Sequence, residues 1–193
     1  MSGAGYAFLS VAPDVVARSP MERRARAAGA RFAVRDGWNV AVEYPEGDRT
    51  VTWADASHLG KLELHGPHGL PLGTARREGD AWVCPLTQGR ALVIGDIRGR
   101  EEGVDVTSGY AALRIQGPLA RELFARFCAL DLRPHITPPG GFRPGSVART
   151  PGMVLCEAED TYLTLVGAAV GEYLWTVVED AGRHLGGGPI PYA

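Results

Sequence analysis

The first half of the chain is dominated by short runs in which apolar and polar residues alternate, which is the period of a β-strand with one buried face. Two such runs flank Asp36-Gly37. An Asp-Gly pair between alternating runs is a common two-residue hairpin turn, so a β-hairpin is predicted here. Further strands are predicted at Val51–Trp53, Leu62–Leu64, Trp82–Leu86 and Ala91–Ile94.

A short helix is predicted before this hairpin, in the segment SPMERRARAAGA. Ser19 can cap its first turn, and Pro20 suits the first helical position. Glu22 is expected to complete a capping box. Gly29 supplies the left-handed residue that commonly ends a helix. The helix is therefore expected to lie between Ser19 and Gly29.

The second half of the chain combines strands with two amphipathic helices. A strand is predicted over Val104–Ile115, and a helix begins at Gly117-Pro118 with apolar residues on one face through Leu130. The segment from Asp131 to Ser146 holds four prolines and three glycines, so it is predicted to be irregular. Later elements are strands near Val147–Glu157 and Tyr162–Val166, and a helix from Val170 to Leu185 that Gly186-Gly187-Gly188 ends.

The order of these elements predicts the fold class. Strand, helix, hairpin and helix is the order of a ferredoxin-like unit, in which helices cover one face of an antiparallel sheet. We therefore predict an α+β protein in which a single domain, residues 1–193, contains two packed ferredoxin-like units at about 19–102 and 103–187. The length suits one domain.

Composition narrows the classes of function. The chain has 193 residues, 45% apolar and 22% charged, and its formal net charge of −2 gives no general attraction to nucleic acid. No stretch approaches the ~18 apolar residues of a membrane span, and the first residues lack the pattern of a signal peptide. Cys84, Cys128 and Cys156 lie far apart among apolar residues. Reduced thiols in a cytoplasmic protein, with no membrane partner, are therefore expected.

Three groups of residues occur together in this chain. The first comprises Ser19-Pro20-Met21, Gly29-Ala30-Arg31-Phe32 and Asp36-Gly37-Trp38. The second is Asp55-x-Ser57-His58-x-Gly60-Lys61 followed by Gly66. The third comprises Leu113-x-Ile115-x-Gly117-Pro118-x-Ala120-x-x-Leu123, the strand entry at Asp160–Leu163, and Tyr173-Leu174-Trp175. Together they resemble the aminomethyltransferases and the gamma subunit of heterotetrameric sarcosine oxidase.

This resemblance covers nearly the whole chain and implies the folate-binding fold of the aminomethyltransferases. Those enzymes carry a further C-terminal barrel, for which 193 residues leave no room, whereas the gamma subunit has about this length. The resemblance therefore implies a non-catalytic gamma-type subunit of a complex that demethylates sarcosine oxidatively and passes the one-carbon unit to tetrahydrofolate. The alternative is a stand-alone folate-binding protein that resembles an aminomethyltransferase.

The resemblance also bears on cofactors. Folate enzymes of this family have a catalytic aspartate in a Gly-Gly-x-x-Asp-Asp-like stretch and a glutamate for the pterin ring in a Tyr-Thr-Gly-Glu-like stretch. The corresponding regions here, Leu86–Asp96 and Val147–Glu157, contain neither. We therefore expect no bound cofactor in the gamma-type role and tetrahydrofolate only in the alternative. A flavin is expected on partner chains, since no glycine-rich nucleotide-binding motif occurs.

Chemically capable side chains cluster between Asp55 and Lys61. In a functional interpretation Asp55 accepts a proton from a substrate amine and His58 shuttles it, while Ser57 and Lys61 contact a cofactor. In a structural interpretation Asp55 and Ser57 bind nearby backbone amides and shape a tight turn, which is their usual role. The structural interpretation is favoured.

Metal ligands and partner surfaces are the remaining candidates. His58, His65 and His68 are irregularly spaced without a supporting cysteine or carboxylate, so no metal site is predicted. The partners expected are the other subunits of a sarcosine oxidase-like complex, or further copies of this chain. The Pro-rich stretch His135–Pro144 and the tail GGGPIPYA are predicted to order against a partner.

Overall fold

Three β-sheets and three α-helices make up the part of the chain that the computed structural model describes, residues 15–192. Residues 1–14, whose sequence lacks a signal-peptide pattern, and residue 193 lie outside this range. The elements are β1 (Ala17–Arg18), α1 (Glu22–Ala27), β2 (Arg31–Arg35), β3 (Trp38–Glu43), β4 (Val51–Asp55), β5 (Gly60–His65), β6 (Arg76–Glu78), β7 (Ala81–Thr87), β8 (Arg90–Gly95), β9 (Val104–Asp105), the 3₁₀ helix η2 (Thr107–Gly109), β10 (Tyr110–Gln116), α2 (Ala120–Ala125), β11 (Phe142–Val147), β12 (Thr150–Ala158), β13 (Thr161–Gly167), the 3₁₀ helix η3 (Ala168–Val170), α3 (Gly171–Arg183) and β14 (Gly187–Pro189).

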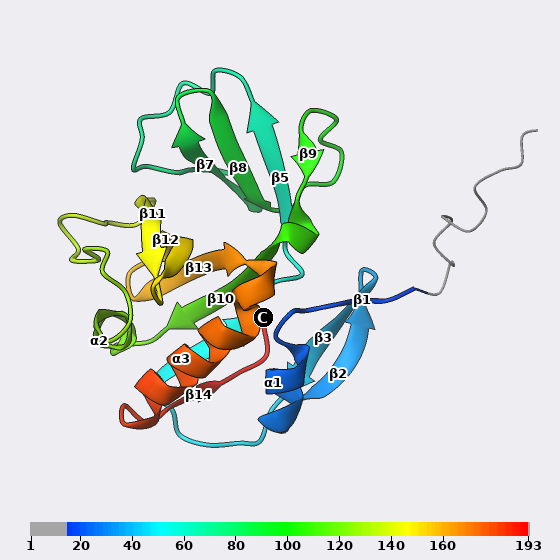
Figure 1. Ribbon diagram of the computed structural model, residues 1–193, viewed down its shortest axis with the longest axis vertical. Helices are drawn as coiled ribbons and strands as arrows, with labels where there is room; N and C mark the ends of the chain where they lie inside the picture. Colours follow the sequence, from blue (N-terminus) through cyan, green and yellow to red (C-terminus); the bar gives the residue numbers. More distant parts are fainter. Residues whose placement is uncertain (1–14, 193) are drawn as a thin grey trace, which may run out of the picture.

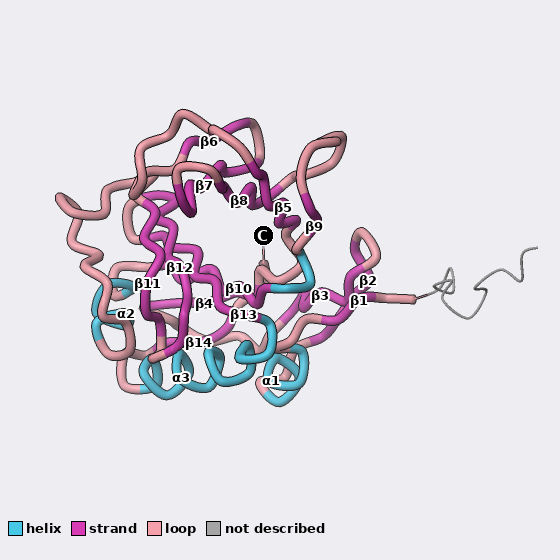
Figure 2. The backbone as a smooth tube through the Cα atoms, turned by 45° about the horizontal axis from the view of Figure 1, so that its top comes forward, coloured by secondary structure: helices cyan, strands magenta, loops and turns pink. Residues whose placement is uncertain are grey.

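A six-stranded sheet of order β11-β12-β13-β10-β4-β14 forms the middle layer (Figures 1 and 2). The helices cover one of its faces, and the five-stranded sheet β6-β7-β8-β5-β9 covers the other. The third sheet, β1-β3-β2, lies to one side with α1. Two apolar cores therefore form, one on each face of the middle layer, and a third, smaller apolar cluster lies within the five-stranded sheet on strands β5, β7 and β8.

Alternation along β10 assigns its residues to these two cores. Leu113 and Ile115 belong to the core under the helices, together with Trp53 of β4 and Trp175 of α3. The two indole rings meet edge to face, with 6.4 Å between their centroids. Residues on the opposite side of β10 face the five-stranded sheet, where Ala112 is buried. Arg114 shares that side, because side chains two positions apart point the same way along a strand.

The predicted hairpin is confirmed. β2 and β3 pair antiparallel, with Arg35 opposite Trp38. Asp36 and Gly37 have φ values of 47° and 77°, the left-handed conformation that both central residues of this turn type need. The hairpin projects from the body of the molecule (Figure 1) and contributes the wall of a cleft described below.

The predicted first helix is confirmed, but its capping differs from the expectation. Ser19 Oγ accepts the amide of Met21 at 3.0 Å, and Gly29 ends the helix with φ 85°. Glu22 forms no capping box. Its side chain is almost buried and accepts a hydrogen bond from Arg26 Nε at 2.9 Å instead, since an arginine one turn later offers a charged partner.

Three other predictions differ from the structure. The strand predicted over Val104–Ile115 is divided into β9, the 3₁₀ helix η2 and β10. Helix α2 ends at Ala125, short of Leu130. Strand β11 occupies Phe142–Val147, within the segment predicted to be irregular, although it includes a proline. Proline is accepted there because β11 is an edge strand, with β12 as its single neighbour in the sheet.

Strand pairing crosses the predicted division near residue 102. β4 precedes the division but pairs with β10, and β9 follows it but pairs with β5. The segment between β4 and β5 consequently connects two different sheets and does not close a hairpin. The α+β class is confirmed, whereas the arrangement as two ferredoxin-like units is not.

The turn between β11 and β12 offers a test of backbone strain. Ala148 and Arg149 both have positive φ, at 50° and 61°. A left-handed backbone costs an L-residue about 1–2 kcal/mol, and glycine avoids this cost. Part of the gain is cancelled, because glycine also increases the conformational entropy of the unfolded chain. Arg149→Gly should therefore stabilise the protein by about 0.5–1 kcal/mol in urea unfolding, whereas Arg149→Ala, which keeps the strain, should not.

Candidate functional site

A cleft of about 1210 Å³ lies where the three sheets meet. The β2–β3 hairpin contributes Arg35 and Asp36, and the end of β8 with the following loop contributes Asp96 and Arg98. His58 lies in its wall. The candidate His58 therefore faces a cavity lined by charges of both signs, which suits a polar ligand.

The turn that carries the sequence candidates is held by its own hydrogen bonds. Asp55 Oδ1 accepts the amide of Ser57 at 2.9 Å. Ser57 is fully buried, and its Oγ accepts the amide of Ala112 at 3.1 Å. These bonds are the ones that the structural interpretation of the turn requires, and they anchor the segment between β4 and β5 to strand β10.

Lys61 has no exposed surface and is turned toward the same turn. Its Nζ donates to the carbonyl oxygens of Ser57 at 2.7 Å and Leu59 at 2.9 Å, with that of Ala56 at 3.5 Å. Burial lowers its pKa to about 8, an effect that Asp55 and Asp105 oppose. The ammonium group therefore fastens the backbone of the turn and does not face the cleft.

His58 is the member of the cluster that faces the cleft. Its ring meets the ring of Tyr192 edge to face, with centroids 4.9 Å apart. Burial lowers the pKa of His58, Asp55 opposes this shift, and the positive charges of Lys61 and Arg114 reinforce it. A neutral imidazole is therefore favoured at neutral pH, which leaves one ring nitrogen able to accept a proton.

The lowered pKa of His58 predicts a dependence of stability on acid. The unfolded chain binds a proton at a histidine near pH 6.5, more readily than folded His58 does, so the contribution of His58 is present above that pH and lost below it. His58→Phe should flatten the fall in urea midpoint between about pH 6.5 and 5. The same loss of slope with exposed His135→Gln would contradict this assignment.

Arg114 and Glu157 are functional candidates that the sequence interpretation did not include as a pair. Arg114 Nε and Nη2 donate to the two carboxylate oxygens of Glu157 at 2.6 and 2.9 Å. The guanidinium lies 4.3 Å from the ring centroid of Tyr192. A charged residue within the mostly apolar run Tyr110–Ile115 was a signal available in the sequence, whereas nothing in the sequence marked Tyr192.

The residues 15–192 contain no group of three His, Cys, Asp or Glu side chains arranged to hold a metal ion. His65 pairs with Glu63 at 2.9 Å, and His68 Nε2 lies 2.6 Å from the carbonyl oxygen of Thr87. The three histidines of the irregular series thus have separate neighbours. None of the described helices is long and apolar enough to cross a membrane.

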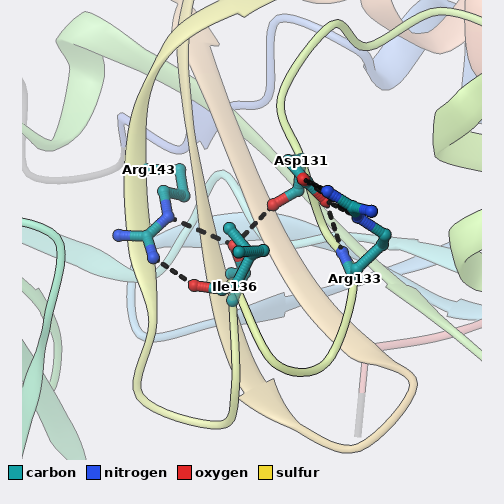
Figure 3. Close-up of polar contacts among 5 residues, drawn as sticks. Asp131, Arg133, Ile136 and Arg143 are labelled. Atoms are coloured by element: carbon teal, nitrogen blue, oxygen red, sulfur yellow. Dashed lines mark hydrogen bonds and ion pairs between the residues drawn. The ribbon is translucent and has the colours of Figure 1, made fainter.

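The two segments predicted to order against a partner also make contacts within this chain. Arg143 donates to the carbonyl oxygen of Ile136 (Figure 3). It also donates to the carbonyl oxygen of Gly73 at 2.8 Å and to Thr137 Oγ1 at 3.2 Å. These bonds fasten the Pro-rich stretch. The C-terminal tail forms β14, which pairs parallel with β4, and then enters the cleft at Tyr192.

Comparison with solved structures relates this architecture to known proteins. The chain superposes on a chain of the heterotetrameric sarcosine oxidase from Corynebacterium sp. U-96, in complex with pyrrole 2-carboxylate, with TM-score 0.70 and 19% identity, covering 88% of this chain and 96% of that one. It superposes on glycine cleavage system aminomethyltransferase T from Bartonella henselae with TM-score 0.71 and 14% identity, covering 91% of this chain and 60% of that one. No family model and no curated protein matches the sequence.

These superpositions confirm the expected resemblance at the level of the fold. The chain spans about 60% of the aminomethyltransferase and nearly all of the sarcosine oxidase chain. This chain has the fold shared by that sarcosine oxidase chain and aminomethyltransferase T.

Proposed function

We propose that the chain is a non-catalytic gamma-type subunit of a sarcosine oxidase-like complex, in which partner chains hold the flavin and oxidise the N-methyl group of sarcosine. The observation that carries this proposal is the near-complete superposition on one chain of a heterotetrameric sarcosine oxidase, 96% of that chain. Only 60% of the aminomethyltransferase is matched. The chain corresponds to a whole subunit of the first and to part of the second.

The internal hydrogen bonds of Asp55, Ser57 and Lys61 support a role without catalysis. Asp55 and Ser57 are bonded to backbone amides, and Lys61 Nζ is bonded to backbone carbonyls. Each of these polar groups would have to give up an internal bond to contact a substrate, at a cost of about 1–3 kcal/mol for each buried group left unpaired. Their arrangement serves the fold.

An exposed apolar pair is the surface that we propose for subunit contact. Leu72 is 57% exposed and Ile136 is 39% exposed. Arg143 binds the carbonyl oxygens of Ile136 and of Gly73, the residue next to Leu72, so it joins the two segments. A surface ordered before binding loses little conformational entropy on association.

Reconstitution tests this proposal directly. The chain would be co-expressed with the flavin-bearing and folate-bearing chains of a heterotetrameric sarcosine oxidase from the same source, and the mixture separated by size-exclusion chromatography. We expect the chain to elute with its partners at a fixed ratio and to be required for full assembly. Assembly and sarcosine oxidation that are unchanged without this chain would refute the subunit role.

A matched pair of variants maps the contact surface. Leu72→Asp should weaken assembly, because a carboxylate placed in an apolar contact has to be desolvated. Val104 of β9 is equally exposed, at 57%, and lies outside the proposed surface. Val104→Asp should therefore leave assembly intact. Equal loss in both variants would place the contact elsewhere.

A second function, binding of a reduced folate by the free chain, is favoured by one observation, the large polar cleft beside His58. Calorimetric titration of the chain with 5-formyltetrahydrofolate separates the two proposals. Binding that His58→Ala abolishes, in a variant that still melts cooperatively, would favour the folate-binding function. Absence of binding by the folded chain is the result expected of a silent subunit.

A further inference from the structure

The ring of Tyr192 lies between a cationic side chain, Arg114, and an aromatic one, His58. The Tyr192 ring lies 4.3 Å from the Arg114 guanidinium carbon and 4.9 Å from the His58 ring centroid. Tyr192 and Arg114 also line a second cavity of about 310 Å³, bordered by Trp82 and Glu157, as well as the 1210 Å³ cleft. The Tyr192 side chain therefore stands where these two spaces meet.

Arg114 is held in place independently of Tyr192. Two parallel hydrogen bonds to Glu157, at 2.6 and 2.9 Å, fix the plane of the guanidinium. The side chains of this pair are only 23% and 12% exposed. Such a guanidinium presents a flat face to the cleft, and a flat cation attracts the face of an aromatic ring.

The attachment of the Tyr192 side chain depends on these ring contacts and on a hydrogen bond between its hydroxyl group and Arg114. Ile190 donates its amide to the carbonyl oxygen of Trp53 at 2.9 Å, continuing the pairing of β14 with β4. Pro191 has no amide hydrogen to donate. The backbone of the tail is thus held through Ile190. The position of the Tyr192 ring is set by its contacts with Arg114 and His58.

We propose that Arg114 and His58 form a binding site for a flat aromatic ring, and that Tyr192 fills this site as an internal ligand. The charge of Arg114 is balanced by Glu157, so the site needs no anion on its ligand. A neutral ring with a small polar substituent, as in a phenol, matches it best. The inference is independent of the subunit role and of folate binding.

Replacing the internal ligand by a free one tests this proposal. Tyr192→Ala in the full chain should bind 4-methylphenol, which is the tyrosine side chain without its backbone, at least about tenfold more tightly than the unmodified chain in calorimetric titration. Tyr192→Phe loses the hydroxyl group that contacts Arg114 but retains the ring, so it should still exclude 4-methylphenol as the unmodified chain does. Equal affinity for 4-methylphenol in all three proteins would overturn the proposal.

A second probe distinguishes an aromatic site from a simple cavity. 4-Methylcyclohexanol has nearly the same size and the same hydroxyl group but no aromatic face, so Tyr192→Ala should bind it much more weakly. Equal binding of the two probes would overturn the aromatic site. In the unmodified chain, saturating 4-methylphenol should shift the Tyr192 ring NMR signals toward those of an exposed tyrosine, and this readout needs no variant. Unchanged signals there would count against displacement.

Discussion

Replacing Lys61 with methionine should destabilise the protein by about 2–4 kcal/mol at pH 7, because it removes the donor that satisfies the buried carbonyls of Ser57 and Leu59. Methionine nearly conserves the volume of the lysine stem, so the loss of packing should be small. Urea unfolding followed by circular dichroism measures this difference.

The effect of Lys61→Met should grow as the pH rises. Burial lowers the pKa of Lys61 from 10.5 in the unfolded chain to about 8 in the folded one, so between these values the unfolded chain binds more protons. The pH-dependent part of the stability that Lys61 contributes is therefore complete above about pH 10.5 and is lost as the pH falls to about 8, over a range of about 3 kcal/mol.

A comparison of pH profiles isolates this contribution from other titrating groups. Between pH 8 and 10 the unmodified chain should gain stability relative to Lys61→Met. Parallel profiles would show that Lys61 keeps its ordinary pKa in the fold. The carbonyls of Ser57 and Leu59 would then hold the ammonium form strongly enough to offset its burial.

Local pattern was sufficient to predict the first helix and the hairpin of this fold. Asp36-Gly37 determines its hairpin because both residues tolerate positive φ, which depends on the two residues alone. Gly29 ends its helix for the same local reason. The pairing of β4 with β10 could not be predicted in this way, since a strand pattern identifies a buried face but not the partner strand.

The candidate site was predictable only in part for a related reason. Asp55 and Ser57 act within a few residues of the turn they shape, and their structural role followed from residue type. Lys61 was a candidate cofactor contact because it lies in the same cluster of chemically capable side chains as Asp55 and His58. The three carbonyls that bind it converge only after the turn has folded. Tyr192 reaches Arg114 from the far end of the chain, a contact that no sequence period encodes.

Glu157→Gln should destabilise the protein by about 2 kcal/mol, the second largest effect expected here. The loss should lie between the values for exposed and fully buried ion pairs, because both side chains are largely but not wholly shielded. Glutamine keeps the shape of the side chain but accepts only one strong hydrogen bond from the guanidinium of Arg114. Urea unfolding at pH 7 measures the difference.

A double-mutant cycle separates the interaction energy between Arg114 and Glu157 from the cost of leaving one charge without its partner. Arg114→Met alone leaves the Glu157 carboxylate without its partner, whereas the double variant strands neither group, so it should be more stable than the sum of the single losses predicts. The exposed pair Asp131–Arg133 in Figure 3 is the matched control, and Asp131→Asn should change stability little. If the losses at Arg114 and Glu157 were simply additive, the pair would not act as a unit. The guanidinium plane that faces Tyr192 would then need another support.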